Sequence, residues 1–145
     1  PRSRGHVTVR SGTLADALLV DPNSFAEPYD LARHIDAIKI TQEVDATRSM
    51  RRYVDHEHFP GPACKSKKDY EDVARANARS SYHPIGTCKM GTDDMAVVDT
   101  KMRVRGIDAL RVCDSSTMPR IVSTNTNAPT IAMAERAADL IRGNR

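Results

Sequence analysis

Hydrophobic and polar residues alternate along His6–Arg10, a pattern of period two that predicts a β-strand with one buried face. A second extended segment is predicted at Ala17–Pro22, where an apolar run is stopped by an aspartate and a proline. Further along the chain, Val97–Val98 and Leu110–Val112 indicate short strands on either side of a turn at Gly106. Both halves of the chain are therefore predicted to contribute strands.

Two segments in the first half have the spacing of an amphipathic helix. The first runs from Asp30 to about Arg51, and its apolar positions are Leu31, Ile35 and Ile38. The second runs from Lys67 to about Arg79, and its apolar positions are Tyr70, Val73 and Ala74. Ser66 is a suitable N-cap for the second helix. The segment Phe59–Pro62 between them is predicted to be a surface loop, because prolines and a glycine interrupt it.

A third helix is predicted from about Ala128 to Arg142, with Gly143 as its stop residue and Asn127 as its candidate N-cap. The apolar stripe of this helix consists of Ile131, Ala134, Ala138 and Ile141. Strands and helices mix along the chain without strict alternation. We therefore predict an α+β fold, with an antiparallel or mixed sheet and flanking helices, forming one domain over residues 1–145.

The composition narrows the class of protein. A hydrophobic content of 39% with 4% aromatic residues fits a globular domain that leaves part of its apolar surface to a partner. Basic and acidic residues are interleaved, with a net charge of +3, so nucleic-acid binding is not expected. The odd number of cysteines, without CxxC spacing, indicates free thiols and a cytoplasmic location. The sequence begins at Pro1 without an initiator methionine, so its lack of a signal peptide carries no weight.

His83 is the first candidate for chemistry. Pro84 favours an extended backbone at His83, and Gly86 allows a sharp turn just beyond it. A histidine fixed in this way outside a regular element can accept or hold a proton near neutral pH. Considered alone, it is more simply an ordinary loop or core histidine.

The start of the last helix is the second candidate. Asn125 and Asn127 precede Pro129, which lies in the first turn, where its missing N–H costs no hydrogen bond. The unpaired N–H groups and the positive end of the helix dipole favour negative charge there, although the two asparagines could simply cap the helix. Asp114 and Ser115 follow an apolar strand and form a polar loop, which could hold a polar cofactor chain or be only a turn.

A metal site is a weaker candidate. His56 and His58 flank Glu57, and alternate residues of a strand share one face. Because no cysteine or third histidine stands at ligand spacing, we predict that the protein binds no metal.

Four motifs occur in a fixed order: His-Pro-Ile-Gly-Thr at 83–87, Val-Val-Asp at 97–99, Leu-Arg-Val-Cys-Asp at 110–114, and Asn-Thr-Asn-Ala-Pro at 125–129. Together they resemble the C-terminal region of the glucose-methanol-choline (GMC) family of flavin-dependent oxidoreductases. The resemblance covers nearly the whole chain. The asparagine at position 125 resembles the choline and alcohol dehydrogenase branch, since many sugar and aryl-alcohol oxidases have histidine there.

The resemblance implies an enzyme that oxidises a primary alcohol, either choline or an aliphatic alcohol, by hydride transfer to N5 of FAD. It makes His83 and Asn125 the catalytic pair. Asp114 and Ser115 would lie along the ribityl and diphosphate part of FAD, and Asn127, Ala128 and Pro129 would face its pyrimidine ring. Dehydrogenase chemistry is preferred over oxidase chemistry, and the electron acceptor could be membrane-associated, with the protein peripheral to the inner membrane.

One family motif is absent. The Gly-x-Gly-x-x-Gly fingerprint of the Rossmann part does not occur in this sequence. We therefore expect the chain to be the C-terminal portion of a longer enzyme, to lack the N-terminal FAD-binding half, and to be inactive alone. The alternative is a stand-alone, non-catalytic interaction module derived from such an enzyme, in which nothing would depend on His83.

Overall fold

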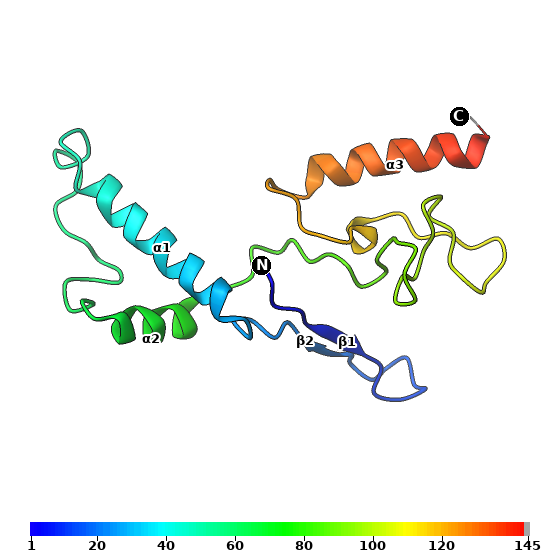
Figure 1. The fold of residues 1–145 in the computed structure, drawn as a ribbon, viewed down its shortest axis with the longest axis horizontal. Coiled ribbons are helices and arrows are strands. Elements are labelled where there is room, and N and C mark those ends of the chain that lie inside the picture. Colours follow the sequence, from blue (N-terminus) through cyan, green and yellow to red (C-terminus); the bar gives the residue numbers. More distant parts are fainter. Residues whose placement is uncertain (144–145) are drawn as a thin grey trace. The chain divides into compact units, whose positions relative to one another are not determined.

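The computed structural model describes residues 1–143, which fall into two compact units, residues 1–79 and the part from Ser80 onward (Figure 1). The first unit contains strands β1 (His6–Thr8) and β2 (Leu19–Asp21) and helices α1 (Pro28–Asp45) and α2 (Lys67–Asn77). The second contains a short 3₁₀ helix, η1 (Ser115–Thr117), and helix α3 (Asn127–Arg142). The predicted α+β class is confirmed. No helix among the described residues is long and apolar enough to cross a membrane.

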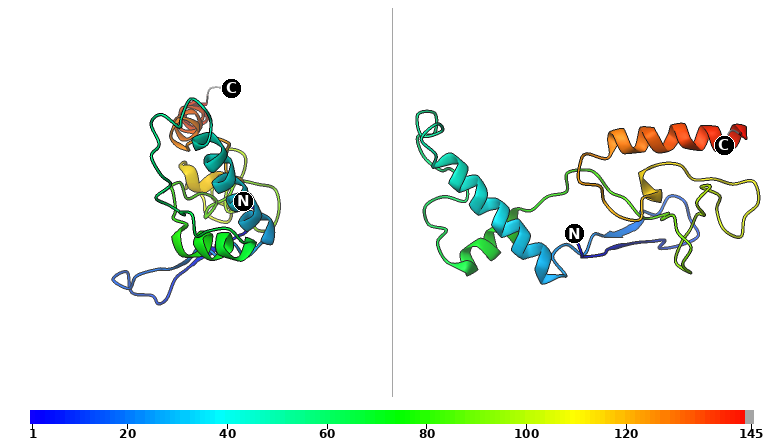
Figure 2. Two further views of the ribbon diagram at one scale, coloured as in Figure 1. Left: turned by 90° about the vertical axis from the view of Figure 1, so that its left-hand side faces the viewer. Right: turned by 45° about the horizontal axis from the view of Figure 1, so that its top comes forward.

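Strands β1 and β2 form a two-stranded antiparallel sheet in which Val7 lies opposite Val20 (Figure 2). The predicted strands are present, although each is shorter than expected. The prediction of one buried face is wrong for this chain, since every residue of both strands is exposed. The reason is geometric: a two-stranded ribbon shields neither of its faces, and alternation produces burial only where another layer covers the sheet.

Gly5, just before β1, lies very close to the backbone at the end of β2. A Cβ atom at position 5 would lie 2.1 Å from the carbonyl oxygen of Asp21 and 2.7 Å from the backbone of Pro22. These are backbone atoms, so no side-chain rotation could make room for it. The close approach between the two chain segments therefore requires glycine at this position.

Helices α1 and α2 pack together and form the core of the first unit. The buried residues of this core are Leu31, Ile35, Cys64, Tyr70 and Ala74. Helix α2 begins as predicted: the Ser66 hydroxyl accepts the N–H of Asp69, and the Asp69 carboxylate accepts the N–H of Ser66. Helix α1 ends at Asp45 and not near Arg51, because both the N–H and the hydroxyl of Thr47 bond to the Val44 carbonyl and tighten the last turn.

Asp30 ties the N-terminus to α1. The Ser3 hydroxyl and the N–H groups of Ser3 and Arg2 all donate to its carboxylate, at 2.5–3.0 Å. These bonds lower the pKa of Asp30 to about 2, with the Ser3 hydroxyl as the largest cause. Asp30 was predicted to open the helix. It lies instead in the first turn, since Pro28 already occupies the first helical position.

The second unit is mostly irregular. The strands predicted at Val97–Val98 and Leu110–Val112 form only isolated bridges, which pair Val98 with Met90 and Val104, and Arg103 with Arg111. The backbone between them is interrupted by positive φ angles at Met102 and Ala109, which no continuous ladder allows. The turn at Gly106, with φ of 76°, is confirmed.

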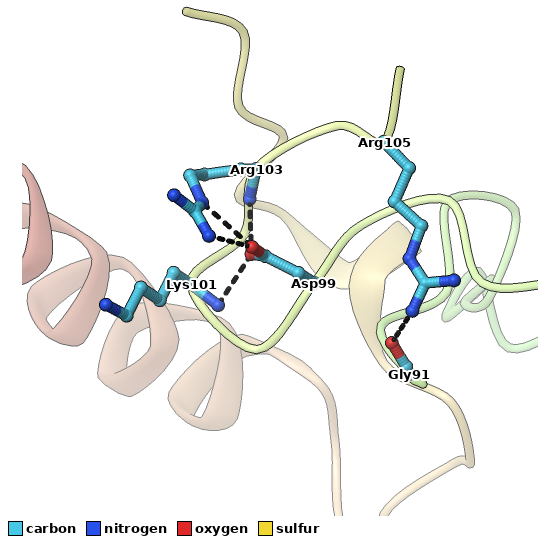
Figure 3. Close-up of polar contacts among 5 residues, drawn as sticks. All are labelled: Gly91, Asp99, Lys101, Arg103 and Arg105. Carbon is cyan, nitrogen blue, oxygen red and sulfur yellow. Dashed lines mark hydrogen bonds and ion pairs between the residues drawn. The ribbon is translucent and has the colours of Figure 1, made fainter. Parts of the chain in front are cut away.

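Asp99 organises this irregular loop (Figure 3). Its carboxylate accepts the N–H groups of Lys101 and Arg103, at 2.8 and 3.0 Å, and the guanidinium of Arg103, at 2.7 Å. Arg105 extends the network, since its guanidinium donates to the carbonyl of Gly91 at 2.8 Å. The backbone hydrogen bond from Arg103, followed by the Arg103 side chain, lowers the pKa of Asp99 to about 2.

Helix α3 ends at Arg142 and is followed by Gly143, which adopts the left-handed conformation of a stop residue as predicted. Its predicted apolar stripe is wrong, because Ile131 and Ile141 are 55% and 62% exposed. The buried position is Ala137, and Met133 on the same face accepts a long contact from the Cys113 thiol through its carbonyl. Ile131 and Ile141 are therefore left exposed, whereas Met133 and Leu140 are partly buried.

The close approach at Gly5 predicts that Gly5→Ala destabilises the protein by roughly 1–3 kcal/mol, because the backbone of β2 must move away from the new methyl group. Gly12→Ala is the matched control, since a Cβ there meets nothing within 4 Å. The free energies of unfolding, measured in urea, should separate the two variants. Equal stabilities would show that the hairpin does not approach Gly5 as described.

The low pKa of Asp99 predicts a pH effect. A carboxylate whose pKa is depressed by folding stabilises the protein above its ordinary pKa of 3.8, and this contribution is lost as the pH falls towards about 2. Asp99→Asn should therefore be less stable than the parent at neutral pH. The difference in stability between the two proteins should decrease as the pH falls from 3.8 to about 2. Thermal unfolding midpoints of both proteins along a pH series measure it. A difference independent of pH would contradict the assignment.

Candidate active site

His83 lies in the irregular segment that opens the second unit. Its side chain is partly buried, and its Nδ1 atom lies 2.8 Å from the hydroxyl oxygen of Thr126. Tyr82 just before it has a positive φ of 60° and is 89% exposed. Gly86 has φ of 88°, a value that requires glycine for an unstrained turn. The predicted turn after His83 is therefore confirmed, and one nitrogen of the imidazole ring has a defined partner.

The polar loop that contains Asp114 and Ser115 lies beside this segment. The Ser115 hydroxyl donates to the carbonyl of Pro84 at 3.1 Å. The N–H of Cys88 then donates to Ser116, and that of Met90 to Thr117, so the two segments run together. Ser115 is partly buried, whereas Asp114 is exposed and accepts the N–H and hydroxyl of Ser116 through its carboxylate.

The third segment is the start of α3. The N-cap residue is Thr126 and not Asn127, which is already the first residue of the helix. The prediction of Asn127 as N-cap is therefore wrong by one position. The reason is that the Thr126 carbonyl accepts the first helical bond, from the N–H of Thr130 at 2.9 Å. Asn125, Asn127 and Ala128 are exposed, and Pro129 is partly buried.

The N-terminus of α3 lacks a side-chain cap. Thr126 is helical at φ of −75° and ψ of −11°, and its hydroxyl makes no capping bond. The first-turn N–H groups of Asn127 and Ala128 therefore remain available for another acceptor, and the positive end of the helix dipole adds to their attraction for negative charge.

The structure thus brings three sequence motifs into one cluster. His83 contacts the segment of Asn125 through Thr126, and the loop of Ser115 contacts His83's neighbour Pro84. The roles assigned to the seven predicted site residues stay predictions. Thr126 was not among those residues. Its position between two candidate asparagines at a helix start was a signal that could have identified it.

Two of the three thiols, those of Cys64 and Cys113, do not offer a reactive centre. All three cysteines are free, as predicted, and burial raises the pKa of the Cys64 and Cys113 thiols. Because the thiolate is the nucleophilic form, a raised pKa makes both poor nucleophiles at neutral pH. Residues 1–143 contain no group of three or more His, Cys, Asp or Glu side chains placed to bind a metal ion.

Comparisons with known proteins agree with the motifs. The family model described as GMC oxidoreductase matches residues 1–134. The alcohol dehydrogenase (acceptor) of Pseudomonas putida is 43% identical over 97% of this chain, and an oxygen-dependent choline dehydrogenase of Burkholderia orbicola is 46% identical over 99%. The solved FAD-dependent oxidoreductase of Chaetomium thermophilum superposes with a TM-score of 0.90 and 30% identity over 96% of this chain.

This chain covers only a small part of each protein that it matches. The chain spans 26% and 25% of the two relatives and 24% of the solved structure. It therefore corresponds to about a quarter of the length of the proteins that it matches. The motif order, the fold and the match over residues 1–134 lead to one conclusion: the chain belongs to the GMC oxidoreductase family, in the neighbourhood of the alcohol and choline dehydrogenases.

Proposed function

We propose that this chain is the substrate-side, C-terminal part of a longer FAD-dependent dehydrogenase that oxidises a primary alcohol to an aldehyde. The observation that carries the proposal is the cluster in which His83, bonded to Thr126, stands at the uncapped N-terminus of α3. A proton acceptor and a site for negative charge, side by side, are what the removal of a proton and a hydride from an alcohol requires.

His83 is the proton acceptor in this proposal. One imidazole nitrogen is held by Thr126 at 2.8 Å, so the other nitrogen is the one that can meet a substrate. It takes the proton of the alcohol hydroxyl while the C–H bond of the carbinol carbon breaks and the C=O bond of the aldehyde forms. The electron pair leaves with the hydrogen as hydride, so the charges balance once an acceptor of hydride is present.

Asn125 is exposed and adjoins the residue that contacts His83, so its side-chain amide can donate to the alcohol oxygen. Such a donor stabilises the negative charge that grows on this oxygen as the proton leaves. Asparagine carries no charge of its own and does not compete with His83 for the proton. The two residues therefore have separate roles, one positioning the oxygen and one accepting the proton.

The residues present fit a bound FAD. In the uncapped first turn of α3, the N–H groups of Asn127 and Ala128 and the positive end of the dipole would attract the electron-rich flavin ring, and Pro129 completes this turn without an N–H. The exposed Asp114 carboxylate can accept bonds from hydroxyl groups of the ribityl chain, with Ser115 beside it. When bound, FAD supplies the acceptor for the hydride.

A longer protein is proposed because this chain leaves its own elements uncovered. Both strands of the hairpin are exposed on both faces, including Val7 at 43% and Val20 at 63%, and so is Ile131 of α3. Isolated two-stranded sheets are marginally stable in water. The match to only a quarter of the relatives' length supports the same proposal.

Choline and an uncharged aliphatic alcohol are both candidate substrates. The chain has four tyrosines and two phenylalanines, so a cage for a trimethylammonium group would come mostly from the rest of the enzyme. Tyr82, which is exposed and precedes His83 in the chain, is one candidate member of such a cage. We propose dehydrogenase chemistry with a carrier other than dioxygen, on the model of the alcohol dehydrogenase (acceptor). The choline dehydrogenase relative is instead named oxygen-dependent.

Replacing His83 by alanine tests the proposal in the complete protein. The rate of alcohol oxidation with an artificial electron acceptor should fall by about 10²- to 10⁴-fold, because the proton acceptor is lost. FAD content, read from the flavin absorbance, should stay the same. His56→Ala is the matched control, since His56 is exposed and bonds only to its neighbour Asp55. Full activity in His83→Ala would refute the catalytic role and favour the interaction-module alternative.

The isolated chain provides a separate prediction. Residues 1–145, purified and mixed with FAD, should oxidise neither choline nor a primary aliphatic alcohol, because the surfaces that hold the cofactor are incomplete. Acceptor reduction assayed beside the complete enzyme measures this. Turnover by the isolated chain at a rate comparable to that of the complete enzyme would contradict the need for a further part.

A further inference from the structure

Thr126 has an unusual arrangement for a threonine at the start of a helix. A threonine N-cap ordinarily turns its hydroxyl to the N–H groups of the first turn. Here the backbone carbonyl of Thr126 accepts hydrogen bonds from the first turns of the helix, from the N–H and the hydroxyl of Thr130 at 2.9 and 2.7 Å. The hydroxyl of Thr126 is directed away from the helix, to Nδ1 of His83 at 2.8 Å. Thr126 is only 7% exposed, so little solvent reaches its end of this bond.

The backbone of His83 is fixed from the other side. The Pro84 carbonyl accepts the Ser115 hydroxyl at 3.1 Å, and the proline ring restricts the conformation of His83. These contacts do not fix the side-chain torsions of His83, which decide where Nε2 points. The bond to Thr126 is the polar contact of the ring, and Thr126 is itself fixed to α3 through the bonds of its carbonyl. The orientation of the imidazole is therefore set by the helix.

We propose that Thr126 is a positioning residue that accepts a hydrogen bond from the Nδ1–H of His83 and so keeps Nε2 unprotonated and directed to the alcohol. This inference rests on the proposed function. A neutral imidazole carries one N–H, and which nitrogen bears it depends on the partner of the other nitrogen. With the proton on Nδ1, Nε2 has the free electron pair that takes the alcohol proton.

The choice of a hydroxyl has a chemical consequence. After Nε2 has taken the proton, both ring nitrogens are donors, and the Nδ1–H bond to Thr126 stays in place. The ring therefore need not rotate during the reaction. A carboxylate at this position would hold the ring as well, but it would add a negative charge beside the oxygen on which negative charge develops. The neutral hydroxyl orients the base without that repulsion.

Two variants of the complete enzyme separate the hydroxyl from the shape of the side chain. Thr126→Val keeps the shape and removes the hydroxyl, so kcat for alcohol oxidation should fall by about 10- to 100-fold while KM changes much less. Thr126→Ser retains the hydroxyl and should restore most of the parent kcat. Thr92→Val, at an exposed threonine of the same unit, is the control for this substitution and should leave kcat unchanged.

The double variant His83→Ala, Thr126→Val tests whether Thr126 acts through His83. If it does, the second substitution causes no further loss in the His83→Ala background. A loss as large as in the parent would overturn the inference, as would equal defects in Thr126→Ser and Thr126→Val or an undiminished kcat in Thr126→Val. If His83→Ala itself retained full activity, the proposed function would fail, and this result is distinct from the others.

A spectroscopic measurement needs no turnover. In the complete protein labelled with ¹⁵N-histidine, the imidazole shifts of His83, assigned by their loss in His83→Ala, report which nitrogen bears the proton. We expect the Nδ1–H form in the parent and in Thr126→Ser. The Nε2–H form in the parent would overturn the inference even if every variant folded poorly. Mixed forms in Thr126→Val with a single form in the parent would support it.

Discussion

The second unit depends on the pairing of the segment after His83 with the carbonyl groups of η1. The N–H of Cys88 bonds to Ser116 and that of Met90 to Thr117, at 3.0 and 2.8 Å, and the fully buried Thr117 bonds back to Asp114 through its own hydroxyl. An unpaired buried hydroxyl would cost more than the bond contributes, so this arrangement tolerates little change. It places the motif of Asp114 against that of His83, so that Ser115 contacts Pro84 although they are 31 positions apart in the sequence.

A second constraint follows from how irregular this unit is. Long ladders are absent from its described residues, and side chains bond to the backbone groups that strands would otherwise pair. Asp99 does so for Lys101 and Arg103, and Asp114 does so for Ser116. Because each of these carboxylates accepts backbone N–H groups nearby, the loops keep fixed shapes without a sheet. Loops of this kind can present several polar groups to a ligand from different directions.

Many large apolar residues of this chain are exposed. The chain buries a small core between α1 and α2, and it leaves the hairpin and the Ile131 side of α3 exposed. In the longer enzyme that we propose, such surfaces would contact its other parts. The predicted half-buried strand and the predicted apolar stripe of α3 were wrong for this chain, because an amphipathic pattern indicates which face can be buried and not whether another element covers it.

By itself, the sequence determined the family, the class of fold, the helix caps at Ser66 and Gly143, and the motifs at His83, Asp114 and Asn125, because each of these depends on residues that are close together in the chain. It placed the start of α3 one residue late and continued α1 too far, since helix ends depend on single hydrogen bonds such as those of Thr47 and Thr126. Only the tertiary structure decided that the Thr126 hydroxyl leaves its helix and holds His83, 43 residues away. A threonine before a helix has the same local pattern in either case, and its choice of partner depends on where the rest of the chain places an imidazole ring.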